Sequence, residues 1–320
     1  MWFKTLSVYR IVDGDFSADQ LDQGARQLAF QPCGPYTKTT CGFVSPWSEG
    51  SELYTHTALD CHRLRFRREE RKLPGAAVKA EVSKRARALI DEEQVEKVTK
   101  DLLKTLKKQV EDDLLPKVLP WQKDVDFYVD NKNRIVVIDD TSAKRCDEIM
   151  SCLRKINPES AFRALMPAED VSEKMNTWVS RGDLPLELEI GEKCQLHHHE
   201  EGVITYRTDF SGDEKLRTYL VEDGFALTSL ELLFDGLLQF DLTTLFVFKS
   251  VKTQDGLLES LDGGEYDDED AYNDAIFSLM VEHYGALIEK MLCALGGEMD
   301  WDTAAEPASS GESGDDEEAA

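Results

Sequence analysis

Five lysines recur at helical spacing near the middle of the chain: Lys97, Lys100, Lys104, Lys107 and Lys108. Ammonium groups arranged in this way pair with phosphates. Apolar residues of the same stretch recur every three or four positions and share the other face at about 100° per residue: Val95, Val98, Leu102, Leu106 and Val110. The pattern predicts a helix over 93–110 with one packing face and one cationic face. A solvated amphipathic helix with no ligand is the competing interpretation.

The lysines belong to a basic stretch in an acidic protein. Residues 63–117 carry 16 Lys or Arg and 11 Asp or Glu, a net of +5, whereas the whole chain has a net charge of −26. Nucleic acid repels so acidic a chain, so contact with a polyanion is expected at the basic stretch. Ten cations of the basic stretch are the candidate phosphate-binding residues: Arg67, Arg68, Arg71, Lys72, Lys97, Lys100, Lys104, Lys107, Lys108 and Lys117.

A pair of carboxylates follows the apolar run 135–138. Asp139 and Asp140 stand where a nucleotidase would hold a metal ion, but the chain has no G-x-x-x-x-G-K-[ST] phosphate loop. A strand that ends in an Asx turn and a helix cap accounts for the same residues. We therefore expect no catalytic residue, and a metal-dependent nuclease is the least favoured alternative.

Three other groups carry metal-binding residue types. Cys33, Cys41, Cys61 and His62 lack the short C-x-x-C pairs of zinc sites. His197–His199 lies in a polar segment that is expected to be an exposed loop. Asp267–Asp270 lacks the alternation and central glycine of a calcium loop. The sequence predicts no metal site and no cofactor.

Composition favours a cytoplasmic protein. No apolar run reaches the roughly 18 residues that span a bilayer, and the first residues lack the pattern of a signal peptide. The chain has 7 cysteines, an odd number, which indicates reduced thiols rather than disulfides.

Short strands and helices are interspersed along the chain, which predicts an α+β fold of several antiparallel sheet-and-helix subdomains. The basic stretch is expected to supply a strand with one charged face over 63–74 and helix over 76–115. Strands are predicted over 2–12, 41–44, 53–59, 186–190 and 203–206, a hairpin over 124–140, strand pairs over 230–249, and helices over 17–28, 142–156, 172–180, 215–221 and 275–295. The expected parts are an N-terminal α+β region (1–62), a basic strand and long helical region (63–121), a C-terminal α+β region (122–297) and a disordered acidic tail (298–320). The tail has nine acids and no Lys or Arg.

Several short motifs, in order along nearly the whole chain, resemble the bacterial recombination-associated protein RdgC family. They are Met1–Leu6 with Tyr9-Arg10, Phe30–Gly34, Gly42–Pro46, Arg67–Pro74, Leu114–Pro116, Ser142–Lys144 with Leu153–Lys155, Thr177–Val179 with Gly182, Gly202–Ile204 and Leu295–Glu298. Each motif is weak alone, and their order makes the combination specific. The chain departs from the family pattern at Phe43, where the family has tryptophan, and at Leu119, where it has an aromatic. Residues 246–249 stand where the family has a basic strand.

The resemblance implies a ring-shaped homodimer that binds double-stranded DNA with little sequence preference through a positively lined hole. It also implies association with the nucleoid and restraint of the recombinase RecA. Single-stranded DNA is a further candidate ligand, and no membrane is involved. Leu119 and Trp121 fall in the region that helps to close the ring. The main alternative is an acidic DNA mimic or recombinase-binding protein, for which the net charge of −26 argues.

Overall fold

The computed structural model describes residues 2–47, 52–92, 97–210, 212–254, 256–257 and 269–301. The chain forms two compact units: Met1–Arg163 with Asp270–Ser278, and Ala164–Glu269 with Leu279–Ala320. The boundaries expected at 62 and 121 both fall inside the first unit. They were wrong because the basic strand pairs with strands that precede and follow it in sequence, and all of them belong to one sheet.

The first unit is built on one seven-stranded sheet with the order β2-β4-β5-β6-β1-β7, and β3 pairs with β4. The strands are β1 (Ser7–Asp13), β2 (Thr39–Val44), β3 (His56–Ala58), β4 (Cys61–Glu70), β5 (Trp121–Asp130), β6 (Ile135–Ile138) and β7 (Ala161–Ala164). Their pairing confirms the α+β class and the hairpin expected over 124–140. The first strand begins at Ser7 rather than at Trp2.

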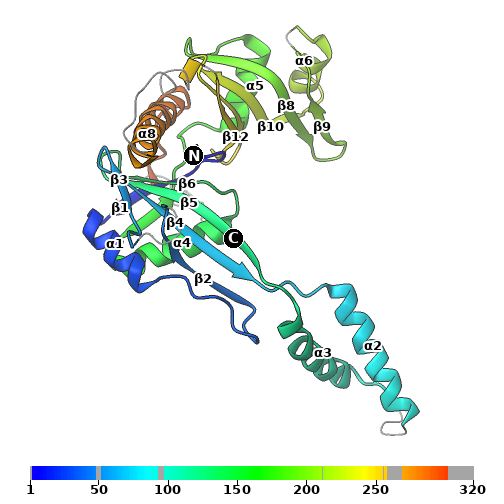
Figure 1. Ribbon diagram of the computed structural model, residues 1–320. Coiled ribbons are helices and arrows are strands. Elements are labelled where there is room, and N and C mark those ends of the chain that lie inside the picture. The colour runs from blue at the N-terminus through cyan, green and yellow to red at the C-terminus, as the bar shows by residue number, and fades with distance from the viewer. Residues whose placement is uncertain are drawn as a thin grey trace, which may run out of the picture. The chain divides into compact units, whose positions relative to one another are not determined.

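Helices α1 (Ala18–Gln27) and α4 (Ala143–Ile156) pack on one face of this sheet (Figure 1). Alternate residues of β4 and β5 point into that core, among them Leu64, Phe66 and Phe127, which are fully buried. Because side chains alternate along a strand, the residues between them lie on the opposite face. That face carries Arg63, Arg65 and Arg67 of β4, whereas Arg68 lies on the side of α4, where it contacts Glu148.

A helical hairpin is inserted between β4 and β5. It contains α2 (Gly75–Asp91), α3 (Lys100–Leu114) and the short η1 (Leu115–Lys117), and it extends from the ends of the two strands (Figure 1). The helix expected over 93–110 is confirmed from Lys100 onward, but residues 97–99 are not helical, so the continuous helix expected over 76–115 was wrong. Thr99 has an extended conformation, and its side chain accepts a hydrogen bond from the Leu102 amide (3.2 Å), so it begins a new helix. Residues 93–96, including Val95, lie outside the described residues, and Lys97 and Val98 precede the helix.

The second unit is a five-stranded antiparallel sheet with the order β12-β11-β10-β8-β9. Its strands are β8 (Leu188–His198), β9 (Gly202–Tyr206), β10 (Ala226–Phe234), β11 (Leu238–Thr243) and β12 (Phe248–Thr253). The helices are α5 (Val171–Arg181), which packs against β10, α6 (Glu214–Val221) and α8 (Glu269–Ala294), whose first part belongs to the first unit. The strand pairs expected over 230–249 are confirmed.

Two expectations in this half need correction. His197 and His198 lie in β8 and pair with Val203 and Gly202, so they are not loop residues. The expected tail is folded at its start. Glu298 forms an isolated antiparallel β-bridge with Pro167, and the Met299 amide donates to the Met166 carbonyl (2.9 Å). The rest of the tail, 302–320, lies outside the described residues, as do Asp267 and Asp268 of the candidate calcium loop.

Candidate nucleic-acid interface

The arginines of β4 are held by carboxylates of β5. The ten-residue register places Arg65 opposite Asp126 and Arg67 opposite Asp124. Both guanidiniums bind through two nitrogens, at 2.8 and 3.2 Å in the first pair and 2.7 and 2.7 Å in the second. Asp126 also accepts from the buried Arg63 (3.1 Å). The charged face of this strand is therefore largely neutralised by its neighbour.

Burial and charge act against each other on Asp126. Burial raises the pKa of this carboxyl, but the hydrogen bonds and charges of Arg65 and Arg63 outweigh it and hold the pKa below its usual value. Asp126 is thus ionised in the folded protein and has two cations as partners. This arrangement stabilises the sheet and leaves little charge for a ligand.

Two further arginines predicted to contact phosphate make internal contacts. Arg68 is only 5% exposed, and its guanidinium lies 3.0 Å from Glu148 of α4 and 3.2 Å from Glu70. Arg71 donates to the backbone carbonyls of Val118 and Cys33. These side chains fix the strand to the helix and the hairpin to the sheet. A phosphate could reach Arg68 only after these ion pairs had opened.

The lysines of α3 are placed differently. Lys100, Lys104, Lys107 and Lys108 are exposed, on the side of the helix away from the buried Leu106 and Val110. Within the described part of the chain, only Lys107 has a carboxylate partner, Glu111 at 3.8 Å, and Glu111 is bound more closely by Lys38 (2.9 Å). Lys97 and Lys117, on either side of the helix, are also exposed. The hairpin therefore presents several ammonium groups to solvent.

The segment after the hairpin carries the two residues expected to close a ring. Leu119 is 88% exposed. Trp121 is half-exposed, and the Lys72 ammonium lies 4.8 Å from the centre of its ring. Lys72 is thus used in part by a cation–π contact, whereas Leu119 points to solvent.

An apolar groove of about 520 Å³ lies between the two helices of the same hairpin. Its apolar lining comes from Leu73, Val78, Val82 and Leu103, with Lys79 and Lys107 at its rim. Leu103 is 40% exposed, so the groove leaves apolar surface uncovered in the isolated chain. The hairpin therefore has an uncovered apolar groove, and the exposed Leu119 follows it directly in the chain.

Sequence reasoning missed a second set of cations. On α2, Lys79, Lys84 and Arg87 are exposed. On the face of the second unit's sheet away from its core, Lys193, Arg207, Lys249 and Lys252 accompany Glu231 and Asp241. The Lys193 ammonium lies 2.5 Å from Glu231, and Lys249 stands opposite Asp241. The alternation of Lys249 and Lys252 with the buried Phe248 and Val251 was the available signal.

The carboxylates considered for nuclease chemistry have structural partners. Asp139 accepts hydrogen bonds from the backbone amides of Lys4 (3.0 Å) and Thr5 (2.8 Å), and burial raises its pKa. Asp140 accepts a hydrogen bond from the Ser142 amide just before α4 (2.8 Å) and binds Arg145 through both oxygens. The Asp140–Ser142 contact matches the Asx turn expected from sequence, whereas Ser142 stands at the N-cap of α4 without a side-chain capping bond. Together these contacts engage both oxygens of Asp140 and Oδ1 of Asp139.

The metal combinations considered from sequence are also not assembled. His62 contacts Thr57 (2.9 Å) and Asn131 (3.2 Å), whereas the Cys33 amide contacts Glu69 (2.7 Å) near the other end of β4. All seven cysteines are free. Across the described ranges, no cluster of three or more His, Cys, Asp or Glu has metal-binding geometry. Among those residues, no helix combines the length and the hydrophobicity that a bilayer span requires.

Comparison with known proteins decides the family. The profile of the family described as "Putative exonuclease, RdgC" matches residues 1–298. The chain belongs to the RdgC family. A protein of Proteus mirabilis named "Recombination-associated protein RdgC" is 32% identical over 301 residues, covering 93% of this chain and 99% of its own. Proteins of the same name from Pseudomonas syringae and Psychromonas ingrahamii are 29% and 27% identical, each covering 93% of this chain and 98% and 99% of their own.

These names agree with the resemblance seen in the short motifs. The RdgC relatives are named for an association with recombination and not as enzymes, although the family description contains the word exonuclease. Asp139 and Asp140, the carboxylates considered from sequence for nuclease chemistry, bind backbone amides and Arg145. The chain is thus a recombination-associated protein of the RdgC family.

Proposed function

We propose that this chain is a sequence-nonspecific double-stranded DNA-binding protein that acts in recombination as a ring-shaped homodimer and restrains RecA at the nucleoid. The observation that carries the DNA-binding part is the lysine side of α3, whose ammonium groups face solvent in a protein of net charge −26. Phosphate contacts by lysine release counterions and do not depend on base sequence. Titration of a duplex at several salt concentrations tests this function directly.

The geometry narrows the candidate contacts. Arg67 forms ion pairs with Asp124, and Arg68 forms ion pairs with Glu70 and Glu148. Their role in DNA binding is therefore indirect. The primary contacts proposed are Lys97, Lys100, Lys104, Lys107, Lys108 and Lys117, with Lys72 at the base of the hairpin. Arg71 donates to the Val118 and Cys33 carbonyls, so its role is indirect as well. The cations of the second unit's open sheet face extend the proposed contact surface.

Homodimer formation is supported by the exposed Leu119, just after the hairpin, and by the apolar groove on the hairpin. In a two-fold symmetric pair each surface patch meets a patch of the partner, so a projecting residue and a recess on one element can serve both copies. We propose that Leu119 of each copy enters the groove of the other, which Leu73, Val78, Val82 and Leu103 line.

Leu119→Asp is expected to convert the dimer to monomer. Burial of one leucine contributes about 1.5–3 kcal/mol. The symmetric dimer buries two copies of Leu119, so the substitution removes at least roughly 3 kcal/mol, which lowers dimer affinity about a hundredfold or more. Sedimentation velocity at micromolar concentration measures the change. Leu186→Asp is the matched control, because Leu186 is fully exposed and lies outside the hairpin. A wild-type protein that is already monomeric would contradict the proposal.

The acidic residues after Trp301 are expected to compete with DNA. Residues 302–320 contain seven acids and no cation, and tethering gives such a segment a high effective concentration near any basic surface of the same protein. Deletion of 302–320 should tighten duplex binding several-fold at low salt and less at high salt, where screening is stronger. Fluorescence anisotropy with full-length and truncated protein at two salt concentrations provides the comparison. Equal affinities at low salt would indicate a tail that only aids solubility.

A further inference from the structure

A groove in the second unit has no part in the proposed DNA contacts. It begins as a pocket of about 380 Å³ where the end of α5 meets α6 and β8, and it continues into a second hollow of about 580 Å³ along the two helices. Ser180, Arg181 and Arg217 line both hollows and so join them. The result is an elongated depression that fits an extended chain better than a compact ligand.

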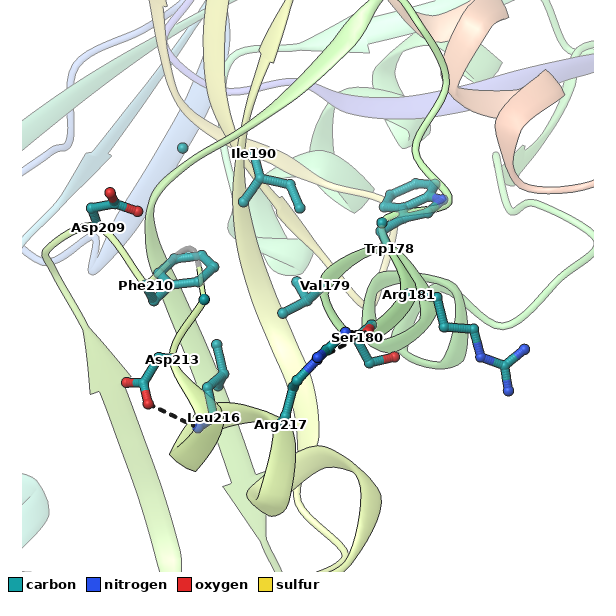
Figure 2. Close-up of a pocket in the computed structure, with 13 residues that line it drawn as sticks. Trp178, Val179, Ser180, Arg181, Ile190, Asp209, Phe210, Asp213, Leu216 and Arg217 are labelled. Atoms are coloured by element: carbon teal, nitrogen blue, oxygen red, sulfur yellow. Dashed lines mark hydrogen bonds between the residues drawn. The ribbon is translucent and has the colours of Figure 1, made fainter.

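The floor of the first pocket is apolar. Val179, Ile190, Phe210 and Leu216 point toward one another across it (Figure 2). Phe210 and Leu216 are buried, and Val179 and Ile190 are half-buried, so the last two remain accessible from the pocket. One apolar side chain of a ligand could be held there.

Two guanidiniums stand at the junction of the hollows. Arg217 donates to the Ser180 carbonyl from Nη2 (2.8 Å) and Nε (3.2 Å), which fixes its position and leaves its other terminal nitrogen, Nη1, with no hydrogen bond recorded among the described residues. Arg181 is exposed, in the last turn of α5, and no carboxylate among the described residues pairs with it. Figure 2 places Asp209 and Asp213 on the other side of the pocket from Arg181, and Asp213 caps α6.

The adjoining strand has an unpaired edge. β8 pairs with β10 over Leu188–His197 but with β9 only from Cys194 onward. The first half of β8 therefore has no strand on its other side within the described part of the chain, and Ile190 and Gly191 of that half line the pocket. An open edge beside an anchoring pocket is the arrangement by which a sheet takes up an extended peptide.

We propose that this groove binds an extended acidic segment of a partner protein that carries one large apolar side chain. The apolar side chain enters the pocket between Val179 and Ile190, and the carboxylates meet Arg181 and Arg217. The chain's own tail is a poor occupant, because residues 302–320 contain no Leu, Ile, Val, Met or aromatic residue. This binding goes beyond the proposed DNA-binding function and does not depend on it.

The test uses the full-length protein and a fluorescein-labelled eight-residue peptide with aspartates on both sides of a central leucine. Anisotropy should report saturable binding that Arg181→Ala weakens about tenfold and Arg181→Glu further, since a charge-assisted hydrogen bond is lost and then replaced by repulsion. Alanine in place of the peptide's leucine should cost about tenfold as well. Lys174→Ala is the matched control on the same helix, because Lys174 lies outside both hollows and pairs with Glu169. It should leave peptide affinity unchanged.

Three outcomes would overturn the proposal. Equal affinity for the leucine and alanine peptides would reduce the site to a nonspecific charge effect. Stronger competition by a peptide of sequence 302–320 would assign the groove to the chain's own tail. Displacement of the peptide from wild type by duplex DNA, together with weaker duplex binding by Arg181→Glu, would assign it to nucleic acid. Because Arg181 is exposed, its variants should remain folded, and unchanged duplex binding by Arg181→Ala would verify this.

Discussion

Replacement of Lys100, Lys104, Lys107 and Lys108 by glutamine is expected to give the largest loss of DNA affinity of any change in this chain. Glutamine keeps the helix propensity of lysine and removes its charge. If all four ammonium groups contact phosphates, the slope of log affinity against log salt should flatten by about 0.9 per contact, roughly 3.6 in all. The ratio of wild-type to variant DNA affinity should then fall roughly 100-fold between 50 and 200 mM salt. The loss should be the same for duplexes of unrelated sequence.

The control for this variant removes the same charge elsewhere. Lys132, Lys144, Lys155 and Lys174 are four lysines outside the hairpin, and their replacement by glutamine changes net charge equally. A small, nonspecific weakening is expected from the control. An unchanged salt slope in the α3 variant would place the DNA-binding surface elsewhere, with the open sheet face of the second unit as the next candidate.

Asp126→Asn is expected to cause the largest loss of stability. The carboxylate binds Arg63 and Arg65, and the side chains of Asp126 and Arg63 are only 10% and 7% exposed. Removal of one partner from a buried ion pair costs about 3–5 kcal/mol, since it leaves uncompensated charge behind. Urea denaturation followed by tryptophan fluorescence measures the loss. Asp124→Asn on the same strand is the control, because the Asp124–Arg67 pair is more exposed, and its loss should cost about 1 kcal/mol.

The pH dependence provides a second check on Asp126. Its folded-state pKa is depressed, so its contribution to stability is present above the unfolded pKa and is lost as pH falls through the folded value. The stability difference between wild type and Asp126→Asn should therefore shrink below about pH 4. A difference that stays constant down to pH 2 would mean that the carboxylate charge does not stabilise the fold.

How far the sequence predicted the site depends on the range over which each signal acts. The apolar and basic periodicity of α3 is local, and it placed Leu106, Val110 and four lysines on the correct faces. The neutralisation of Arg65 and Arg67 is not local, because it depends on the register of β4 with a strand about 60 residues further along the chain. A basic strand alone therefore could not be distinguished from a phosphate-binding one.

Element boundaries failed for a related reason. Periodicity continued through residues 93–99, but the Thr99 side chain caps a new helix, and packing of α2 against α3 requires the chain to reverse there. The domain boundaries failed because β4 and β5 are separated by the hairpin in sequence and adjacent in the sheet. The approximate extents of α5, α6 and α8 were predicted correctly: α5 and α6 each have one apolar face, and α8 is a long run of mostly apolar, helix-forming residues.

The hairpin is inserted between two paired strands in a way that should allow it to be deleted without disturbing the sheet. Glu70, the last residue of β4, stands directly opposite Trp121, the first residue of β5, and opposed residues in an antiparallel pair are about 5 Å apart. A tight two-residue turn can bridge that distance. Excision of the residues between them would leave the ten-residue ladder closed on itself. The same junction would accept a foreign helical hairpin, so the sheet could act as a neutral scaffold on which the charge and length of the inserted arm are varied.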